Sequence, residues 1–374
     1  MDFYKRTWAE VNIENIKNNY ISLSENLADT VKKCCVVKAD GYGHGAVKIA
    51  RELVNLGANY FAVATIDEAI ELREAGIETP ILILGYTPPE CAKALAENNL
   101  TQCVYALEYA DLLGKNAKRT NSKIKIHIKV DSGMGRIGFS AFDATEAVRD
   151  IESVALCESF DVEGIFTHFA VADGGDAGIA YTRGQYERFL SLVMKLESRG
   201  ITFEIKHCAN SAAIIDYPEM ALDMVRMGIA LYGLEPSPDV IKRLDLKPAM
   251  TFKSVITLVK NIEAGRSVSY GCNYTAKETR KIATVAAGYA DGFERHNTGS
   301  FVLVGGKKAN VIGNVCMDQF MIDVTDIDCK IGDEVILFGD ADGVLSADIV
   351  AEKCKTINYE VVCGVSKRVL RIYD

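Results

Sequence analysis

The chain has 374 residues, of which 49% are hydrophobic and 25% are charged, and its formal net charge is −9. This length accommodates one large domain and a smaller one, and the composition is that of a globular protein. The acidic balance argues against a surface for nucleic acid or anionic membranes, and no run approaches the roughly 18 apolar residues of a membrane helix. We therefore expect no nucleic-acid partner and no membrane partner.

The cysteines and the first residues bear on the cellular compartment. Eleven cysteines occur, without the paired spacing of a zinc site or of a secreted disulfide framework. Residues 1–20 contain no apolar core of a signal peptide. Reduced, mostly buried thiols are typical of cytoplasmic proteins, so we expect a cytoplasmic protein without a metal site.

Residues 30 to 235 repeat one rhythm of an apolar run, a polar turn and a helical stretch. The helical stretch 66–76, for example, begins with acidic residues and ends at Gly76, as helices commonly do. Such alternation predicts parallel strands joined by crossover helices, and eight successive units predict a closed (β/α)8 barrel of the TIM type. The eight apolar runs are 34–39, 60–65, 80–85, 101–106, 124–131, 161–169, 203–209 and 224–233.

The rhythm stops at a proline-containing stretch, residues 233–250, and alternating patterns follow. These patterns are typical of antiparallel strands separated by Gly and Asp turns. We therefore predict an α/β fold in which a barrel domain, residues 1–240, precedes a smaller, mostly-β domain, residues 241–374. The expected strand segments are 252–262, 281–292, 300–306, 310–326 and 333–340, with one helix at 346–354.

In such barrels the active residues lie on the loops after the carboxyl ends of the strands. Phosphate is commonly bound by the loops after strands seven and eight, where Ser211 and Gly228 suit the task. Lys38 follows the first strand and enters a turn rich in glycine. A lysine near a phosphate cradle suggests pyridoxal 5′-phosphate, to which lysine amines bind as Schiff bases. The strand ends supply Lys38, Tyr42, Arg136, His168, the segment 207–211 and the segment 226–229.

Seven sequence blocks, in this order, resemble those of bacterial alanine racemases over essentially the whole chain. Any one block alone is a weak signal, because a lysine before a glycine turn is common. The blocks are CVVKADGYGHG (35–45), KVDSGMGRIGF (129–139), HCANSAA (207–213), RMGIALYG (226–233), VSYGCNY (268–274), GYADGF (288–293) and GNVCMDQFMID (313–323).

The resemblance implies roles for individual residues. Lys38 is expected to be the Schiff-base lysine and the base for the D-enantiomer, and Tyr270, from a second subunit, the base for the L-enantiomer. Arg226 is expected to face the pyridine nitrogen, and His168 to lie between Arg226 and the catalytic tyrosine. The residues expected to hold the cofactor phosphate are Tyr42, Ser211, Gly228, Ile229 and Tyr359.

Further implied roles concern the substrate. Arg136 is expected near the substrate carboxylate and the cofactor's phenolic oxygen, and Lys129 is expected to be carbamylated, which would steady that arginine. Met317, Tyr289 and Asp318 match positions of the substrate channel. The resemblance also implies a homodimer with shared active sites and a role in supplying D-alanine for peptidoglycan.

The chemistry of racemisation also calls for two bases. Racemisation removes a proton from one face of a planar carbanion and returns it to the other, and one base cannot easily reach both faces. A tyrosine base needs a lowered pKa, which Arg226 or a protonated His168 would provide. A guanidinium against the ring nitrogen keeps that nitrogen unprotonated, which limits the carbanion's lifetime.

The residues by themselves leave plainer alternatives open. Lys38 would otherwise be a lysine that snorkels from a strand end, and His168 a satisfied core histidine. Tyr270 would be an ordinary sheet aromatic, and Lys129 would pair with Asp131 on the same strand face. His207 is expected to support rather than catalyse. Two departures from the family pattern stand out, Asn314 where a basic residue is frequent and Leu370 where a proline is usual.

Other functions also remain open at this stage. A serine or broad-specificity racemase would use the same scaffold, although Tyr359 leaves little room for a hydroxymethyl group. A decarboxylase of the same plan would pair the ring nitrogen with an acid instead of Arg226. A non-catalytic barrel that carries the cofactor would lack residues 250–374 and hence Tyr270.

Overall fold

The computed structural model describes residues 5–339 and 343–374, which form two compact units. The barrel unit comprises Ile16–Gly41 and Ala46–Lys247, and the β-rich unit comprises Met1–Asn15, Tyr42–Gly45 and Pro248–Asp374. Neither unit is one continuous stretch of sequence, whereas the predicted division at residue 240 assumes two continuous domains. The N-terminal strand and the glycine turn after Lys38 therefore fold with the C-terminal half of the chain.

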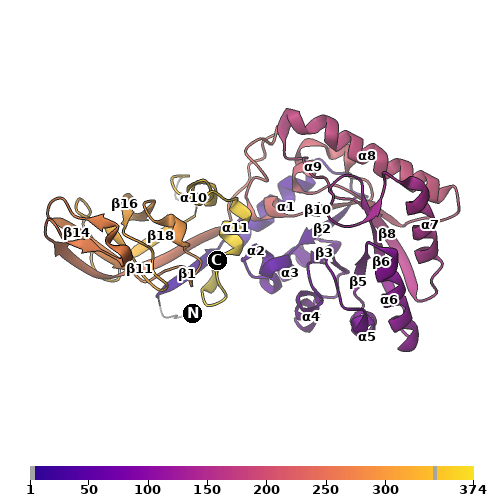
Figure 1. Ribbon diagram of the computed structural model, residues 1–374, viewed down its shortest axis with the longest axis horizontal. Helices are drawn as coiled ribbons and strands as arrows, with labels where there is room; N and C mark the ends of the chain where they lie inside the picture. The colour runs from indigo at the N-terminus through magenta and orange to yellow at the C-terminus, as the bar shows by residue number, and fades with distance from the viewer. Residues whose placement is uncertain (1–4, 340–342) are drawn as a thin grey trace. The chain divides into compact units, whose positions relative to one another are not determined.

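The barrel unit contains eight parallel strands (Figure 1), ordered β10-β2-β3-β4-β5-β6-β8-β9. The Asp223 N–H donates to the Lys206 carbonyl and the Arg226 N–H to the Ala209 carbonyl, both at 3.0 Å, and these bonds close the ring between β9 and β10. The eight strands coincide with the eight apolar runs, which confirms the predicted barrel. They are β2 Lys32–Val36, β3 Tyr60–Val63, β4 Ile81–Ile83, β5 Thr101–Val104, β6 Ile124–Asp131, β8 Phe160–Phe166, β9 Ile205–His207 and β10 Met224–Met227, with β7 Phe139–Ser140 beside β6.

Helices alternate with these strands and surround them (Figure 1). The helix α4 begins where the predicted one does, because Thr65 caps it and the Glu68 side chain returns to the Thr65 backbone, the reciprocal capping box. The helices are α1 Ile13–Ser24, α2 Lys38–Tyr42, α3 Ala46–Asn55, α4 Ile66–Glu74, α5 Ala92–Glu97, α6 Leu107–Arg119, α7 Ala144–Ala155, α8 Gly175–Glu197 and α9 Ser211–Asp216, with short 3₁₀ turns η1 Pro89–Cys91, η2 Pro218–Met220 and η3 Ile229–Tyr232. No helix in the described ranges has the length and apolar character needed to cross a membrane.

The β-rich unit is built on an eight-stranded sheet ordered β14-β17-β16-β15-β18-β11-β1-β19, in which β14 also pairs with β11. The predicted C-terminal strand segments overlap β11 and β14–β18. Residues 286–292 and 313–319, however, form turns and loops and not strands, and residue 340 lies outside the described residues. The strands are β1 Thr7–Val11, β11 Met250–Ile262, β14 Arg280–Val285, β15 Phe301–Val304, β16 Lys307–Ile312, β17 Phe320–Asp323, β18 Glu334–Phe338 and β19 Leu370–Tyr373, with a separate pair β12 Ser267–Val268 and β13 Tyr274–Thr275. The helical elements are η4 Tyr270–Cys272, η5 Arg295–Asn297, α10 Ala347–Cys354 and α11 Asn358–Cys363.

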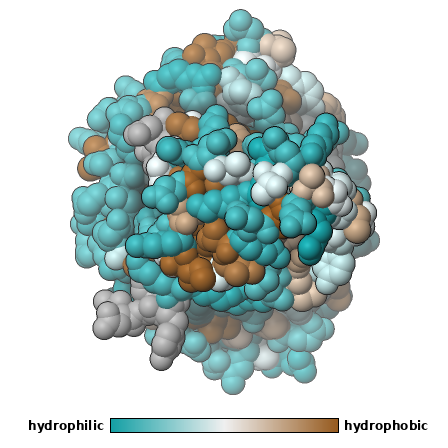
Figure 2. Space-filling model, turned by 90° about the vertical axis from the view of Figure 1, so that its left-hand side faces the viewer, coloured by the Kyte–Doolittle hydropathy of each residue, from teal (hydrophilic) through white to brown (hydrophobic). Residues whose placement is uncertain are grey.

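The two ends of the chain meet in this sheet, which the sequence analysis did not predict. β1 pairs antiparallel with β11 and parallel with β19. The parallel pairing of β1 with β19 departs from the expected antiparallel pattern. Leu370, where the family pattern has a proline, opens β19 at the sheet edge with 52% of its surface exposed. Figure 2 looks onto the end of this unit that carries β14 and β16, where hydrophobic groups gather near the centre of a mostly hydrophilic surface.

Candidate active site

Lys38 lies at the start of a left-handed turn, α2, directly after the first barrel strand. Ala39 and Asp40 both have φ 53°, and Gly41 has φ 61°, with ψ between 46° and 49°. Left-handed backbone costs roughly 1–2 kcal/mol for each residue with a Cβ, and such strain concentrates at functional sites. The Glu68 carboxylate accepts from the Ala39 N–H at 2.7 Å and helps to hold the turn. The glycine-rich turn that the sequence indicated is therefore a specific, strained support for Lys38.

Arg226 lies on β10 at the same end of the barrel and is 3% exposed. Its Nη1 donates to His207 Nδ1 at 2.9 Å, and its Nη2 lies 2.9 to 3.2 Å from the Thr167 and Cys208 carbonyls and His168 Nδ1. All four acceptors are uncharged carbonyls or imidazoles. Within the described part of the chain, no carboxylate bonds to this guanidinium.

His168 follows β8 and lies among cations. Burial and the charges of Arg226, Lys129, Arg136 and Lys38 lower its pKa well below the ordinary value. The imidazole is therefore neutral and accepts a hydrogen bond from Arg226 through Nδ1. The sequence analysis allowed a protonated His168 as the charge that lowers a tyrosine pKa, and this environment argues against it.

Lys129 is buried on β6, with 2% of its surface exposed, and its Nζ donates to the Val130 carbonyl at 2.6 Å. Burial lowers the pKa of its ammonium to about 8. No close ion pair joins Lys129 to Asp131 in the structure, although the two charges attract each other, and Asp131 Oδ1 accepts the N–H groups of 133, 134 and 135 at 2.9 to 3.0 Å. Arg136 lies exposed on the loop that this carboxylate organises.

The loops after β9 and β10 are tied together by Ser211. This serine begins α9, and its Oγ accepts the N–H of Gly228 at 2.9 Å and that of Ala230 at 3.4 Å. Ile229 begins the turn η3 in the same place. Two helical N-termini thus meet at the position where barrels commonly bind phosphate.

In the β-rich unit, Tyr42 and Tyr359 lie near each other, with ring centroids 6.1 Å apart. Tyr359 is on α11, and the segment 42–45 packs closely against that helix. A Cβ at Gly43, which has φ +80°, would lie 2.3 Å from the Val362 carbonyl oxygen. Glycine at this position is therefore required both by backbone conformation and by space.

Tyr270 lies on a strained loop between β12 and β13 and is 70% exposed. Ser269 has φ 66°, and Gly271 has φ 76°. Asn314 Nδ2 donates to the Tyr270 carbonyl at 2.6 Å, and Ser269 Oγ donates to the Asn314 carbonyl at 2.6 Å. The Asn314 amide, at a position where a basic residue is frequent in the family, therefore holds the backbone of Tyr270.

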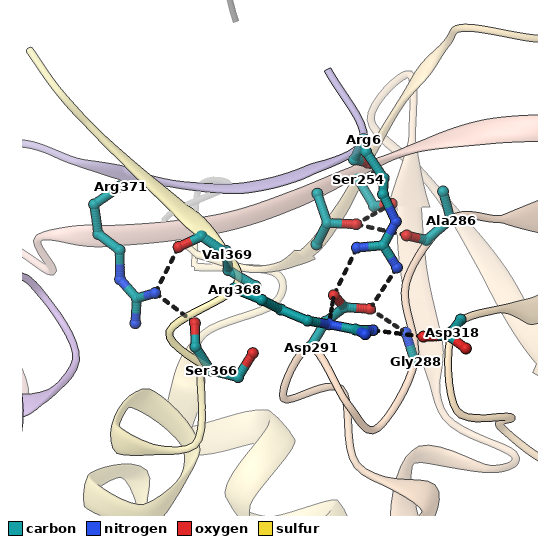
Figure 3. Close-up of polar contacts among 11 residues, drawn as sticks. Arg6, Ser254, Ala286, Gly288, Asp291, Asp318, Ser366, Arg368, Val369 and Arg371 are labelled. Carbon is teal, nitrogen blue, oxygen red and sulfur yellow. Dashed lines mark hydrogen bonds and ion pairs between the residues drawn. The ribbon is translucent and has the colours of Figure 1, made fainter. Parts of the chain in front are cut away.

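Met317, Tyr289 and Asp318 lie on adjacent loops of the β-rich unit. A buried acid, Asp291, organises these loops, and Figure 3 shows its contacts together with Asp318. Asp291 accepts from Arg6 Nη1 at 2.7 Å and Nη2 at 3.0 Å, from Arg368 Nε at 2.7 Å and from the Gly288 N–H at 3.0 Å. Burial alone would raise the pKa of Asp291, but these donors outweigh it and hold the pKa below its ordinary value. Arg368 also binds Asp318 at 2.8 Å.

Comparison with known proteins identifies the family. The descriptions "Alanine racemase, N-terminal domain" and "Alanine racemase, C-terminal domain" match residues 11–236 and 249–373. The chain belongs to the alanine racemase family. It is 47% identical to "Alanine racemase 2" of Caldanaerobacter subterraneus subsp. tengcongensis, covering all of this chain and 96% of that protein.

Solved structures of alanine racemases have the same fold as this chain. That of Clostridium difficile 630 is 46% identical, with a TM-score of 0.95 over 100% of this chain and 97% of that one. An alanine racemase from Bacillus anthracis with bound L-Ala-P is 38% identical, with a TM-score of 0.95 over 100% and 96%. A histidine racemase from Leuconostoc mesenteroides subsp. sake is 28% identical with a TM-score of 0.89 over 100% and 99%, so the fold alone does not determine the substrate.

Alanine racemases depend on pyridoxal 5′-phosphate, and the barrel unit has residues that fit this group. The serine-linked loops after β9 and β10 suit a phosphate, and Lys38 supplies an amine at the same end of the barrel. Arg226 presents a buried donor rather than an acid. Sequence reasoning missed Asp291 and Arg368, although the acid in GYADGF and the basic residues near the C-terminal end were visible signals.

Proposed function

We propose that this chain interconverts L-alanine and D-alanine in the mouth of its barrel. The observation that carries the proposal is Arg226, a buried guanidinium bonded only to neutral acceptors, at the same end of the barrel as Lys38. A decarboxylase of this plan would pair the ring nitrogen with an acid. When bound, pyridoxal 5′-phosphate supplies an electron sink for the substrate's α-carbon.

The two bases act from opposite faces of the substrate. Lys38 Nζ removes the α-proton of D-alanine or returns it, and the Tyr270 hydroxyl does the same for L-alanine. Because His168 is neutral, the charge beside it is that of Arg226, which donates to the imidazole Nδ1 and holds the ring in place. With the cofactor bound, the Arg226 guanidinium would donate to the ring nitrogen and keep that nitrogen unprotonated.

Other residues bind and orient. We assign the phosphate to Ser211, Gly228, Ile229, Tyr42 and Tyr359. Arg136 binds the substrate carboxylate. Lys129, whose pKa is lowered by burial to about 8, carries more neutral amine near neutral pH than an exposed lysine does, and it is carbamylated and steadies Arg136. Met317, Tyr289 and Asp318 line the approach of the substrate.

Two copies of the chain share their sites. Tyr270 is 70% exposed, and Met317 and Tyr289 are 53% and 43% exposed, so these side chains are available to another molecule. A two-fold dimer, in which each β-rich unit serves the barrel of the other copy, yields two equivalent composite sites. The family's usual role, supply of D-alanine for peptidoglycan in the cytoplasm, is the role we propose for this chain.

The deciding experiment follows the α-proton. Purified protein loaded with pyridoxal 5′-phosphate is incubated with L-alanine in deuterium oxide, and D-alanine formation and deuterium content are measured. We expect D-alanine deuterated at Cα, with much slower turnover of L-serine and L-histidine. Equal or faster turnover of L-serine would assign a serine or broad-specificity racemase, and absence of exchange would leave a cofactor-carrying protein without catalysis.

A further inference from the structure

A chain of polar side chains runs through the barrel interior from Arg226 towards the opposite end of the strands. Arg226 Nη1 bonds to His207 Nδ1 at 2.9 Å, His207 Nε2 to His127 Nδ1 at 2.9 Å, and His127 Nε2 to Glu163 Oε2 at 3.0 Å. Both imidazoles are fully buried. Glu163 Oε2 also accepts from the Tyr60 hydroxyl at 2.6 Å, which lies 2.8 Å from the Thr101 hydroxyl.

The chemistry of the two ends fixes the direction of every bond between them. A guanidinium only donates, so His207 Nδ1 accepts and its proton lies on Nε2. His207 Nε2–H then donates to His127 Nδ1, and His127 donates through Nε2–H to Glu163. All donors point from Arg226 towards the carboxylate, so both histidines are neutral and have the same tautomer.

The charges agree with this direction. Burial lowers the pKa of both imidazoles, and neighbouring Arg226 lowers that of His207 further. Burial alone would raise the pKa of Glu163, but the hydrogen bonds from His127 and Tyr60 outweigh it and hold the carboxyl ionised. The hydrogen-bonded chain thus begins at a buried guanidinium and ends at an ionised carboxylate, with two neutral imidazoles between them.

The backbone aims Glu163 into the barrel by a bulge. In the pairing of β6 with β8, Ile126 lies opposite Val162 but His127 lies opposite Gly164, so Glu163 is the extra residue. Bulges redirect side chains in this way. Gly164 is required beside it, because a Cβ there would lie 2.8 Å from His127 Cε1 and Nε2.

We propose that Glu163, through His127 and His207, is a positioning residue for Arg226. Its carboxylate fixes the tautomers of both imidazoles, and His207 therefore presents an acceptor that holds the guanidinium in place. This inference rests on the proposed function only in that Arg226 is the residue expected to face the cofactor ring. The tautomers themselves are a property of the protein without substrate.

The first test is ¹⁵N NMR of protein labelled at histidine, which contains five such residues. Signals are assigned by replacing each histidine in turn with glutamine. We expect His127 and His207 to carry their protons on Nε2 at neutral pH in the wild type. A proton on His207 Nδ1, or a charged His207, would overturn the proposal even if Glu163→Gln does not fold.

The second test compares Glu163→Gln with Tyr60→Phe and Glu204→Gln. Glutamine keeps the shape of Glu163 but removes the charge, and we expect altered ring-nitrogen signals of His127 and His207 and a kcat about tenfold lower with KM for L-alanine little changed. Tyr60→Phe keeps the carboxylate, so the tautomers should persist. Glu204 pairs with exposed Lys32 at 3.0 Å, and its variant should match the wild type.

Unchanged ring-nitrogen signals and unchanged kcat in Glu163→Gln would refute the positioning role. If Tyr60→Phe disturbs the tautomers as much as Glu163→Gln does, packing rather than charge holds the chain, which would also refute it. A wild-type protein without racemase activity would contradict the proposed function instead, and the NMR result would still decide the tautomers.

Discussion

The barrel mouth and the Tyr270 loop supply the two proposed bases under opposite conditions. Around Arg226 nearly every polar group is buried and bonded, and the protonation states are set by neighbours in the same unit. Tyr270, in contrast, is 70% exposed on a strained loop that is held by its backbone through Asn314. The groups that bond to Arg226 all belong to the same chain. The backbone of Tyr270 is also held by its own chain, but its side chain is not enclosed by buried polar groups as Arg226 is.

This difference suggests that the two regions control their functional groups in different ways. A buried cluster fixes charges because desolvation and fixed donors act on it permanently. An exposed phenol keeps an ordinary environment until another surface covers it. Substitutions in both regions can test whether the buried cluster and the exposed Tyr270 loop differ in this way.

Replacing Lys38 should have the largest effect. We expect Lys38→Ala to lower kcat for alanine racemisation by ~10⁴-fold or more, because one proton-transfer group and the covalent attachment are both lost. Racemisation is measured by D-alanine formation. Lys33→Ala, on the strand β2 that precedes Lys38, should stay within about twofold of the wild type, and a similar loss in both variants would show that lysine charge in this part of the chain, not the base, matters.

Tyr270→Phe should lower kcat by roughly 10²–10⁴-fold, because it removes only the hydroxyl. Mixing this variant with Lys38→Ala after dissociation and reassociation should restore activity. Since a mixed two-fold dimer contains one site with both bases intact, about a quarter of all sites should recover. A mixture that stays inactive despite forming mixed dimers would show that both bases come from the same chain.

Lys129 should show a pH dependence that the exposed loop does not. Its folded pKa of about 8 lies below the ordinary value, so the amine becomes neutral as pH rises through about 8. Carbamate forms only on the neutral amine. At fixed dissolved CO₂ we expect a ¹³C carbamate signal that grows across this pH and is absent in Lys129→Arg.

The same shift affects stability. Unmodified Lys129 binds its proton less tightly in the folded state than in the unfolded state, so the free energy of unfolding should rise as pH increases from about 8 towards 10.4. Lys129→Met should flatten that rise, as measured by urea denaturation. An unchanged slope would mean that the amine is not buried in solution or is already modified.

Asn314→Ala should have the smallest effect. It removes the amide that donates to the Tyr270 carbonyl, a bond worth about 1 kcal/mol, and we expect kcat to fall several-fold with little change in melting temperature. Asn310→Ala, on the exposed face of β16, is the matched control. If both variants behave alike, the Tyr270 loop does not depend on this bond.

Much of the fold follows from sequence because its signals are local. The eight apolar runs and the helical stretches between them have periods that the chain reveals within about ten residues, and all eight became barrel strands. The pairing of β1 with β19 did not follow, because it joins residues more than 350 positions apart that carry no matching local pattern. Glu163 was similarly overlooked, although Gly164 within a strand is a typical signal of a bulge.

The sequence by itself determined the family, the barrel with its following β-rich part, and the identity of the residues proposed as bases and binding groups. Tertiary structure alone decided that His168 is neutral, that Lys129 is bonded to a carbonyl and not to Asp131, and that two imidazoles connect Arg226 to Glu163. The reason is physical. Protonation and hydrogen-bond direction depend on burial and on charges that folding brings close together. Residues adjacent in the sequence carry no information about either.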